Sequence, residues 1–214
     1  MENNLKAIII AGGELINPRL FYRNYGTDDF VIAADSGYDF LTRIDIKPNL
    51  IIGDMDSIQT KLPETDNTIE IIKYPTDKDH SDLELAIKYS KERNFSDIII
   101  LGGIGTYIDH SLANILSIAA YSDKNTVIRM ITPDITIIPF CDRLVMSGYK
   151  GRRFSFFLIK SGDKTVFDGA AYNYKSQPLS IMDFSLSNRI IQDTLEIDLF
   201  GGKGVIMVFR EDNL

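Results

Sequence analysis

The N-terminal part of the chain alternates short apolar runs with stretches of helical periodicity. The runs are rich in isoleucine and lack the strict alternation of a half-exposed strand; they occupy residues 7–11, 30–34, 50–52, 69–74, 98–101 and 127–131. Such near-continuous runs are typical of strands buried on both faces of a parallel sheet. We therefore predict an α/β fold, with a mostly parallel α/β/α layer domain over residues 1–137.

Two segments between these runs carry the spacing of an amphipathic helix. In residues 81–93 the positions Leu83, Ala86 and Ile87 share one face, and residues 109–121 repeat the pattern. Ser81 and Glu84 match a capping box, which predicts that the first of these helices begins there. In open α/β sheets ligands bind beyond the carboxyl ends of the strands, so the residues that follow each run are the candidate site.

The pattern changes after Phe140. Residues 153–159, 194–199 and 205–210 alternate or are aromatic, and glycine-containing breaks separate such runs at 147–148, 161–162, 168–169 and 201–202. No helical pattern is evident in this part. We predict that residues 138–214 form a small C-terminal all-β sandwich domain.

Two acidic clusters follow predicted strands. Asp54 and Asp56 come directly after an apolar run, and a second cluster over residues 77–82 leads into the first helix. Carboxylates this close repel one another, and a bound cation can neutralise them. Mg²⁺ with a substrate phosphate is the commonest such arrangement. We predict a catalytic centre that binds Mg²⁺ through Asp54, Asp56 and Asp82, one of which, or Asp79, accepts a proton. The alternatives are a surface turn with Ser57 capping a helix, and an acidic first turn that complements the helix dipole.

Glycines and small polar residues follow the other runs. Glycines allow tight turns or a close approach of backbone to ligand, and loops before a helix suit phosphate. Plain turns, and a helix cap at Asp35, are the competing interpretations. The predicted nucleotide-binding residues are Gly12, Gly13, Asp35, Ser36, Ser57, Gly102, Gly103, Asp109 and His110.

Charge and cysteine content narrow the functional classes. The net charge of −7 over 214 residues argues against general affinity for nucleic acid or anionic membranes. It does not exclude an anionic substrate, since a bound metal reverses the local field. The single cysteine, Cys141, excludes an intrachain disulfide and fits a reducing compartment. The first residues lack the features of a signal peptide, so we expect a cytoplasmic protein without nucleic-acid or membrane partners.

Taken in order, four motifs resemble the thiamine pyrophosphokinase family. They are A-D-S-G at 34–37, K-P-N-L-I-I-G-D-M-D-S at 47–57, D-K-D-H-S-D at 77–82 and G-T-Y-I-D-H at 105–110. A late pair, Ser187 and Asn188, is similar to a Ser-Asn segment of the family. The resemblance therefore covers the α/β part well and extends into the β part.

The resemblance implies a reaction and an assembly. ATP would donate a pyrophosphoryl group to the hydroxyl of thiamine, leaving AMP, with Mg²⁺ on the acidic motifs. The protein would be a homodimer, with thiamine held between the α/β domain of one subunit and the β domain of the other. Ser187 and Asn188 would then bind substrate, and residues 138–214 would serve thiamine binding and dimerisation.

One departure from the family pattern bears on the nucleotide. Tyr107 stands where the family has arginine, so a fixed cationic phosphate contact is absent from this loop. Either Lys78 or Arg129 substitutes, or metal and backbone amides hold the nucleotide with less cationic help. The rival functions are a metal-dependent phosphatase using Asp54 and Asp56 as a D-x-D pair, and a non-catalytic nucleotide or thiamine sensor.

Overall fold

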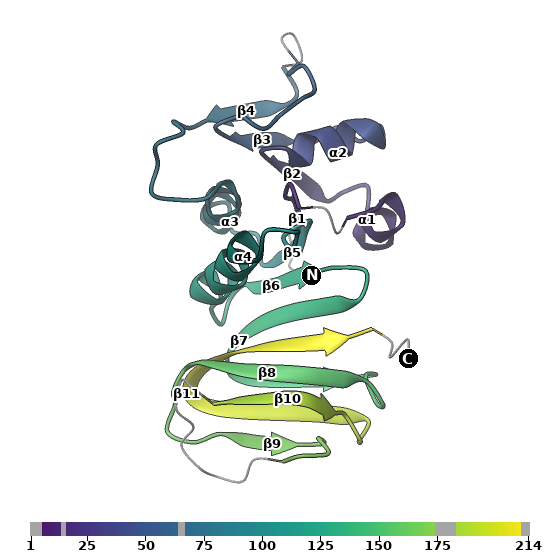
Figure 1. Cartoon of the computed structure of the whole chain (residues 1–214), viewed down its shortest axis with the longest axis vertical. Coiled ribbons are helices and arrows are strands. Elements are labelled where there is room, and N and C mark those ends of the chain that lie inside the picture. The colour runs from purple at the N-terminus through teal and green to yellow at the C-terminus, as the bar shows by residue number, and fades with distance from the viewer. Residues whose placement is uncertain (1–5, 14–15, 64–66, 174–182, 211–214) are drawn as a thin grey trace. The chain divides into compact units, whose positions relative to one another are not determined.

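The chain divides into two compact units. The computed structural model describes residues 6–13, 16–63, 67–173 and 183–210. The first unit comprises Met1–Tyr121 and Asn125–Pro133, and the second comprises Ser122–Lys124 and Asp134–Leu214. Figure 1 labels their helices and strands.

A parallel sheet forms the centre of the first unit. Its order is β6-β5-β1-β2-β3-β4, and all of these strands run parallel. The order reverses at β1, which leaves a crevice between the ends of β1 and β5. The strands are β1 Lys6–Ile10, β2 Phe30–Ala34, β3 Leu50–Gly53, β4 Glu70–Lys73, β5 Asp97–Leu101 and β6 Val127–Ile131.

The predicted isoleucine-rich runs correspond to these six strands, with one difference in burial. Most residues of β1, β2, β3 and β5 are buried, as their sequence indicates. In contrast, β4 is largely exposed, so the expectation that residues 69–74 are covered on both faces is wrong. The reason is position, because β4 is the last strand of the order and pairs with β3 alone.

Helices cover both faces of this sheet, with α1 and α2 on one side and α3 and α4 on the other (Figure 1). Phe21 and Leu41, from α1 and α2, pack with Ile8 and Ile10 of β1 in one core. The predicted capping box of Ser81 and Glu84 is confirmed at the start of α3. The helices are α1 Pro18–Asn24, α2 Gly37–Arg43, α3 Asp82–Glu92 and α4 Ile108–Tyr121.

The second unit consists of antiparallel strands. Their order is β10-β8-β11-β7, and β9 pairs with β11. Phe154, Phe156 and Phe167 are among the buried side chains of its core. The strands are β7 Ile135–Ser147, β8 Arg153–Lys160, β9 Val166–Asp168, β10 Phe184–Arg189 and β11 Thr194–Phe209.

The longest strand of this unit, β11, was predicted as two. Its first part pairs with β7 and β9, and its last part pairs with β7 and β8. The register shifts between Asp198 and Lys203, around Gly201 and Gly202. The glycines therefore bend one continuous strand where the sequence pattern indicated a break.

The mixed α/β class predicted from the sequence is confirmed. The finer description, with a layer domain over 1–137 and a sandwich over 138–214, stays a prediction. No helix among the described residues combines the length and apolar character needed to cross a bilayer.

Candidate active site at the carboxyl edge of the parallel sheet

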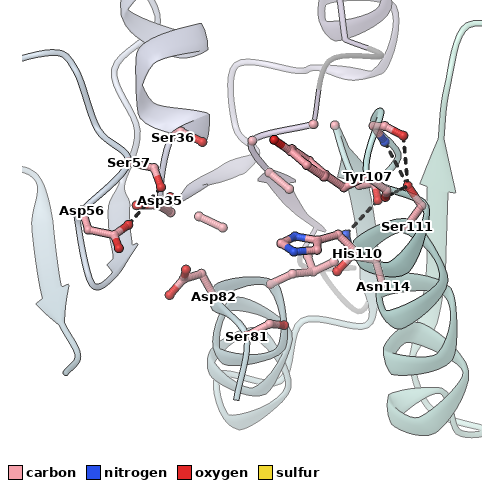
Figure 2. A pocket seen from close by; sticks show the side chains of 18 residues that line it. Asp35, Ser36, Asp56, Ser57, Ser81, Asp82, Tyr107, His110, Ser111 and Asn114 are labelled. Atoms are coloured by element: carbon pink, nitrogen blue, oxygen red, sulfur yellow. Dashed lines mark hydrogen bonds between the residues drawn. The ribbon is translucent and has the colours of Figure 1, made fainter. Parts of the chain in front are cut away.

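A cavity of about 370 Å³ opens where the strands of the first unit end. Its lining comes from the loops after β1, β2, β3 and β5 and from the starts of α3 and α4. Figure 2 shows acidic side chains on one side of the cavity and the rings of Tyr107 and His110 on the other. This is the edge at which parallel α/β sheets bind ligands.

Three carboxylates, from Asp35, Asp54 and Asp82, form an acidic centre. One oxygen from each lies within 4.8 Å of those of the other two. Asp35 follows β2, Asp54 follows β3, and Asp82 is the first residue of α3. Because β2 and β3 are neighbours in the sheet, their carboxyl ends bring the first two side chains together.

Two oxygens of the acidic centre lack a hydrogen bond. Asp35 Oδ1 and Asp82 Oδ1 are buried and have no hydrogen-bond partner. Buried polar atoms in folded proteins normally have one, and carboxylate oxygens are the ligands that Mg²⁺ prefers. The residues present therefore fit a divalent cation.

Backbone geometry brings the acidic centre together. Gly53 has φ of 146°, and a Cβ there would lie only 2.9 Å from Asp82 Oδ1. Asp35 and Met55 are left-handed, with φ of 48° and 69°. Such conformations cost free energy for residues with a side chain and are concentrated at functional sites. Asp39 of α2 holds the loop beyond Met55 by accepting hydrogen bonds from two backbone N–H groups, at 2.8 and 3.0 Å.

Lys78 is the cation paired with the acidic centre. Its Nζ donates a hydrogen bond to Asp54 Oδ2 at 2.6 Å and lies 3.2 Å from Asp82 Oδ1, without hydrogen-bond geometry to the latter. The hydrogen bond from Lys78 lowers the pKa of Asp54 although burial opposes it. Burial raises the pKa of Asp82 despite the nearby ammonium. Burial disfavours the charged form of Lys78, but its two carboxylates outweigh this and raise the pKa.

The glycine loops after β1 and β5 are in direct contact. Gly13 N–H donates to the Gly102 carbonyl at 2.7 Å. A Cβ on Gly13 would lie 2.3 Å from that carbonyl, and one on Gly102 would lie 2.3 Å from the Ala11 carbonyl. The close approach of two loops thus accounts for these glycines, and their contact with a nucleotide stays a prediction.

The wall opposite the acidic centre is built from the start of α4. The rings of Tyr107 and His110 lie 5.6 Å apart, and the Tyr107 side chain is highly exposed. Ser111 Oγ accepts from Gly105 N–H at 3.1 Å and donates to the Tyr107 carbonyl at 2.9 Å. Asn114 Nδ2 donates to the Gly103 carbonyl at 2.8 Å. These two α4 side chains fix the loop that leads into the helix.

Most predicted site residues line the cavity. They are Gly12, Gly13, Asp35, Ser36, Asp56, Ser57, Asp82, Gly102, Gly103 and His110. Asp35 does not cap α2, because the N-cap is Ser36, and no helix begins at Ser57. Asp56 stands outside the acidic centre; it is exposed and accepts a hydrogen bond from Ser57 Oγ at 2.9 Å.

Apart from Asp54 of the acidic centre, four predicted site residues are not part of the cavity lining. Asp79 and Asp109 are exposed. In the second unit, Asn188 is fully buried and bonds to both the N–H and the carbonyl of Tyr172, whereas Ser187 is exposed. The predicted roles of all four stay predictions.

Sequence reasoning missed the grouping of Asp35 with Asp54 and Asp82, and the place of Lys78 beside them. The available signal for Asp35 was that it follows an apolar run at once, as Asp54 does; that the two strands are neighbours is known only from the sheet. Ser111 and Asn114 were also missed. Their spacing of three on α4, facing a glycine loop, was the corresponding signal.

The family described as "Thiamin pyrophosphokinase, catalytic domain" has a sequence model that matches residues 22–130, more than half of the chain. The chain belongs to the thiamin pyrophosphokinase family. The match to this family includes the acidic centre and Lys78, and it ends before β7 begins.

Two curated members of the family match this chain over less than half of its length. "Thiamin pyrophosphokinase 1" of Caenorhabditis elegans is 29% identical over 85 residues, 37% of this chain and 34% of that protein. "Thiamine pyrophosphokinase 1" of Oryza sativa subsp. japonica is 30% identical over 106 residues, 45% of this chain and 40% of that protein. The chain thus matches two fifths or less of the length of these curated relatives.

Solved structures of the family share the fold over almost the whole chain. Thiamine pyrophosphokinase from Bacillus subtilis has a TM-score of 0.79 at 22% identity, covering 96% of this chain and 99% of that one. The yeast enzyme has a TM-score of 0.75 at 20% identity, covering 98% and 87%. At these identities the likeness is one of fold.

Proposed function

We propose that this protein transfers a pyrophosphoryl group from ATP to the hydroxyl of thiamine, giving thiamine diphosphate and AMP. The hydroxyl oxygen attacks the β-phosphorus, the bond from that phosphorus to the oxygen retained by AMP breaks, and the hydroxyl loses its proton. The observation that carries the proposal is the acidic centre, which lies beside a glycine-lined cavity in a member of this family.

In this proposal Asp35, Asp54 and Asp82 would hold Mg²⁺, which would supply positive charge opposite the transferred phosphoryl group. The two buried oxygens without hydrogen-bond partners support this ligand set. Asp56, from the metal set predicted by sequence, lines the same cavity and remains a candidate ligand. A carboxylate of this edge accepts the hydroxyl proton; Asp79 is less favoured because it neither lines the cavity nor belongs to the acidic centre.

The proposal includes an expected binding site for each of the two substrates. The ATP phosphates are expected at the loops after β1 and β5, where the strand order reverses. Thiamine is expected between the α/β domain (1–137) of one subunit and the β domain (138–214) of another, near Ser187 and Asn188. The working form would therefore be a homodimer, and we expect it in the cytoplasm.

The deciding experiment is incubation with ATP, Mg²⁺ and thiamine, with mass detection of products. We expect thiamine diphosphate and AMP in equal amounts. Asp54→Asn and Asp82→Asn should each lose about 10²–10⁴ in kcat/KM, as expected for groups that stabilise transition-state charge. Asp28→Asn, which removes an exposed carboxylate elsewhere, is the matched control.

Two other outcomes would contradict the proposal. Phosphate release without thiamine would indicate the D-x-D phosphatase, and tight ligand binding without turnover would indicate a sensor. The phosphatase is less favoured because Asp56 lies outside the acidic centre, which Asp54 forms with Asp35 and Asp82.

A further inference from the structure

Lys78 occupies an unusual position for an ammonium group. It lies in the loop between β4 and α3, its side chain is only 12% exposed, and it reaches Asp54 and Asp82. Burying a charged amine costs free energy unless oppositely charged partners compensate. Lys78 therefore depends on the same carboxylates that are candidates for holding a divalent cation.

The ammonium and a divalent ion cannot both keep close contact with these two carboxylates. Mg²⁺ binds carboxylate oxygens at about 2.1 Å and demands near-octahedral geometry. The Nζ already lies 2.6 Å from Asp54 Oδ2 and 3.2 Å from Asp82 Oδ1, so an added cation would face strong repulsion. Asp35 has no ion pair with Lys78 to break, and its buried Oδ1 has no hydrogen-bond partner.

The cavity needs a positive charge if it is to hold phosphates. None of the described residues that line it is lysine or arginine. Arg129 of β6 is committed elsewhere, with its guanidinium 2.5 and 2.6 Å from the two carboxylate oxygens of Asp97. Lys78, in contrast, is paired with Asp82, which lines the cavity, and its flexible four-carbon stem allows the head group to move.

We propose that Lys78 is an exchangeable counterion: a divalent ion displaces its ammonium from Asp54 and Asp82, and the displaced ammonium then contacts the phosphates of the nucleotide. The exchange concerns only the acidic centre, whereas the phosphate contact rests on the proposed function. Lys78 thus links metal binding to the arrival of positive charge in the cavity.

The exchange is tested by metal alone, without nucleotide or thiamine. Mn²⁺ shares the oxygen ligands of Mg²⁺, and its free concentration can be read by electron paramagnetic resonance. Lys78→Met removes the competitor and should bind Mn²⁺ about tenfold more tightly than wild type. Lys88→Met, on α3 and outside the cavity lining, removes the same charge and should match wild type.

A second variant keeps the test decisive if Lys78→Met does not fold. Lys78→Arg retains the charge and offers a two-pronged pairing with carboxylates, so it should bind Mn²⁺ more weakly than wild type. Unchanged or weaker Mn²⁺ binding by a folded Lys78→Met overturns the exchange. If only Lys78→Arg folds, unchanged binding by that variant overturns it.

The phosphate contact is tested with Mn²⁺ at saturation and an α,β-methylene analogue of ATP, which cannot be cleaved at that bond. Lys78→Met should bind the analogue at least tenfold more weakly than wild type, and Lys88→Met should not. Equal affinity in Lys78→Met overturns the phosphate contact. A wild type that shows the exchange but forms no thiamine diphosphate overturns the proposed function and leaves the exchange standing.

Discussion

Gly53 illustrates how one missing side chain gives shape to the acidic centre. It ends β3, and the Asp82 carboxylate lies 2.9 Å from where its Cβ would be. The same residue allows φ of 146°, a conformation that residues with a Cβ rarely adopt. Gly53 therefore sets both the turn into Asp54 and the approach of Asp82.

We predict that Gly53→Ala lowers the free energy of unfolding by about 1–3 kcal/mol, because strain and steric overlap add. It should also weaken Mn²⁺ binding, because Asp82 is pushed away. Gly148→Ala is the matched control, since Gly148 also has positive φ but its Cβ would meet nothing within 4 Å. Urea unfolding of both variants measures the strain, and Mn²⁺ titration measures the displacement of Asp82. Equal Mn²⁺ affinity in the two variants would contradict the prediction.

Asp82 gives a second prediction at this scale, through its charge. Burial raises its pKa above the ordinary 3.8, so the ionised form opposes folding at neutral pH. In chelator, Asp82→Asn should therefore raise the stability at pH 7. The gain should shrink as pH falls through the raised pKa and vanish below 3.8, where both states of the wild type are protonated. Thermal unfolding across this pH range measures it, and a destabilised variant at pH 7 would refute the sign.

At the scale of elements, α3 positions the acidic centre through its first turn. Ser81 Oγ accepts from Glu84 N–H at 3.2 Å, and Glu84 accepts from Ser81 N–H at 2.9 Å. These bonds satisfy free N–H groups of the helix start, and Asp82 is the next residue. The cap thus holds the backbone of Asp82 in place and so positions its carboxylate.

Ser81→Ala should cost about 1 kcal/mol of stability through loss of the cap. Because the first turn then frays, Mn²⁺ affinity should fall as well. Asn17→Ala removes the side-chain cap of α1 and should cost a similar amount without changing metal binding. Chemical unfolding and Mn²⁺ titration of both variants provide the measurements. Equal Mn²⁺ affinity in Ser81→Ala and Asn17→Ala would contradict the prediction.

The sequence predicted where helices and strands lie along the chain better than it predicted which elements pack beside them. The isoleucine runs located β1 to β6, and the capping box located the start of α3, because these signals are local. The exposure of β4 depends on strand order, which no local pattern contains. Likewise, the predicted apolar face of α4 includes Leu112 and Leu116, which are exposed in the structure.

The acidic centre shows the same limit. Asp54 and Asp56 are close in sequence, which favoured them as a pair, yet Asp56 is exposed and lies outside the acidic centre. Asp35 joins Asp54 because β2 and β3 are adjacent, although eighteen residues lie between the two aspartates in the sequence. The residue types of the centre were therefore predictable, whereas its membership required the sheet order.

At the scale of the whole molecule, the predicted homodimer has a candidate surface on the second unit. Phe184 and Leu186 of β10 are 53% and 55% exposed, and β10 is the last strand of its order. Exposed apolar side chains on an edge strand are typical of association sites.

We predict that Leu186→Glu raises the dimer dissociation constant at least tenfold, because a charge would be buried on assembly. Leu186→Ile keeps the side chain apolar and should sediment as wild type does. Analytical ultracentrifugation at assay concentration provides the measurement. A wild type that is fully active as a monomer would remove the need for the dimer.

The bent strand β11 has a consequence for how the protein is made on the ribosome. It pairs with β7, β8 and β9, yet it is synthesised after all three. The six strands of the first unit precede β7, so that unit can fold while synthesis continues. The second unit must wait for β11, and until then the aromatic strand β8 lacks its central partner. A chaperone that binds nascent apolar segments would therefore find its target in the second unit.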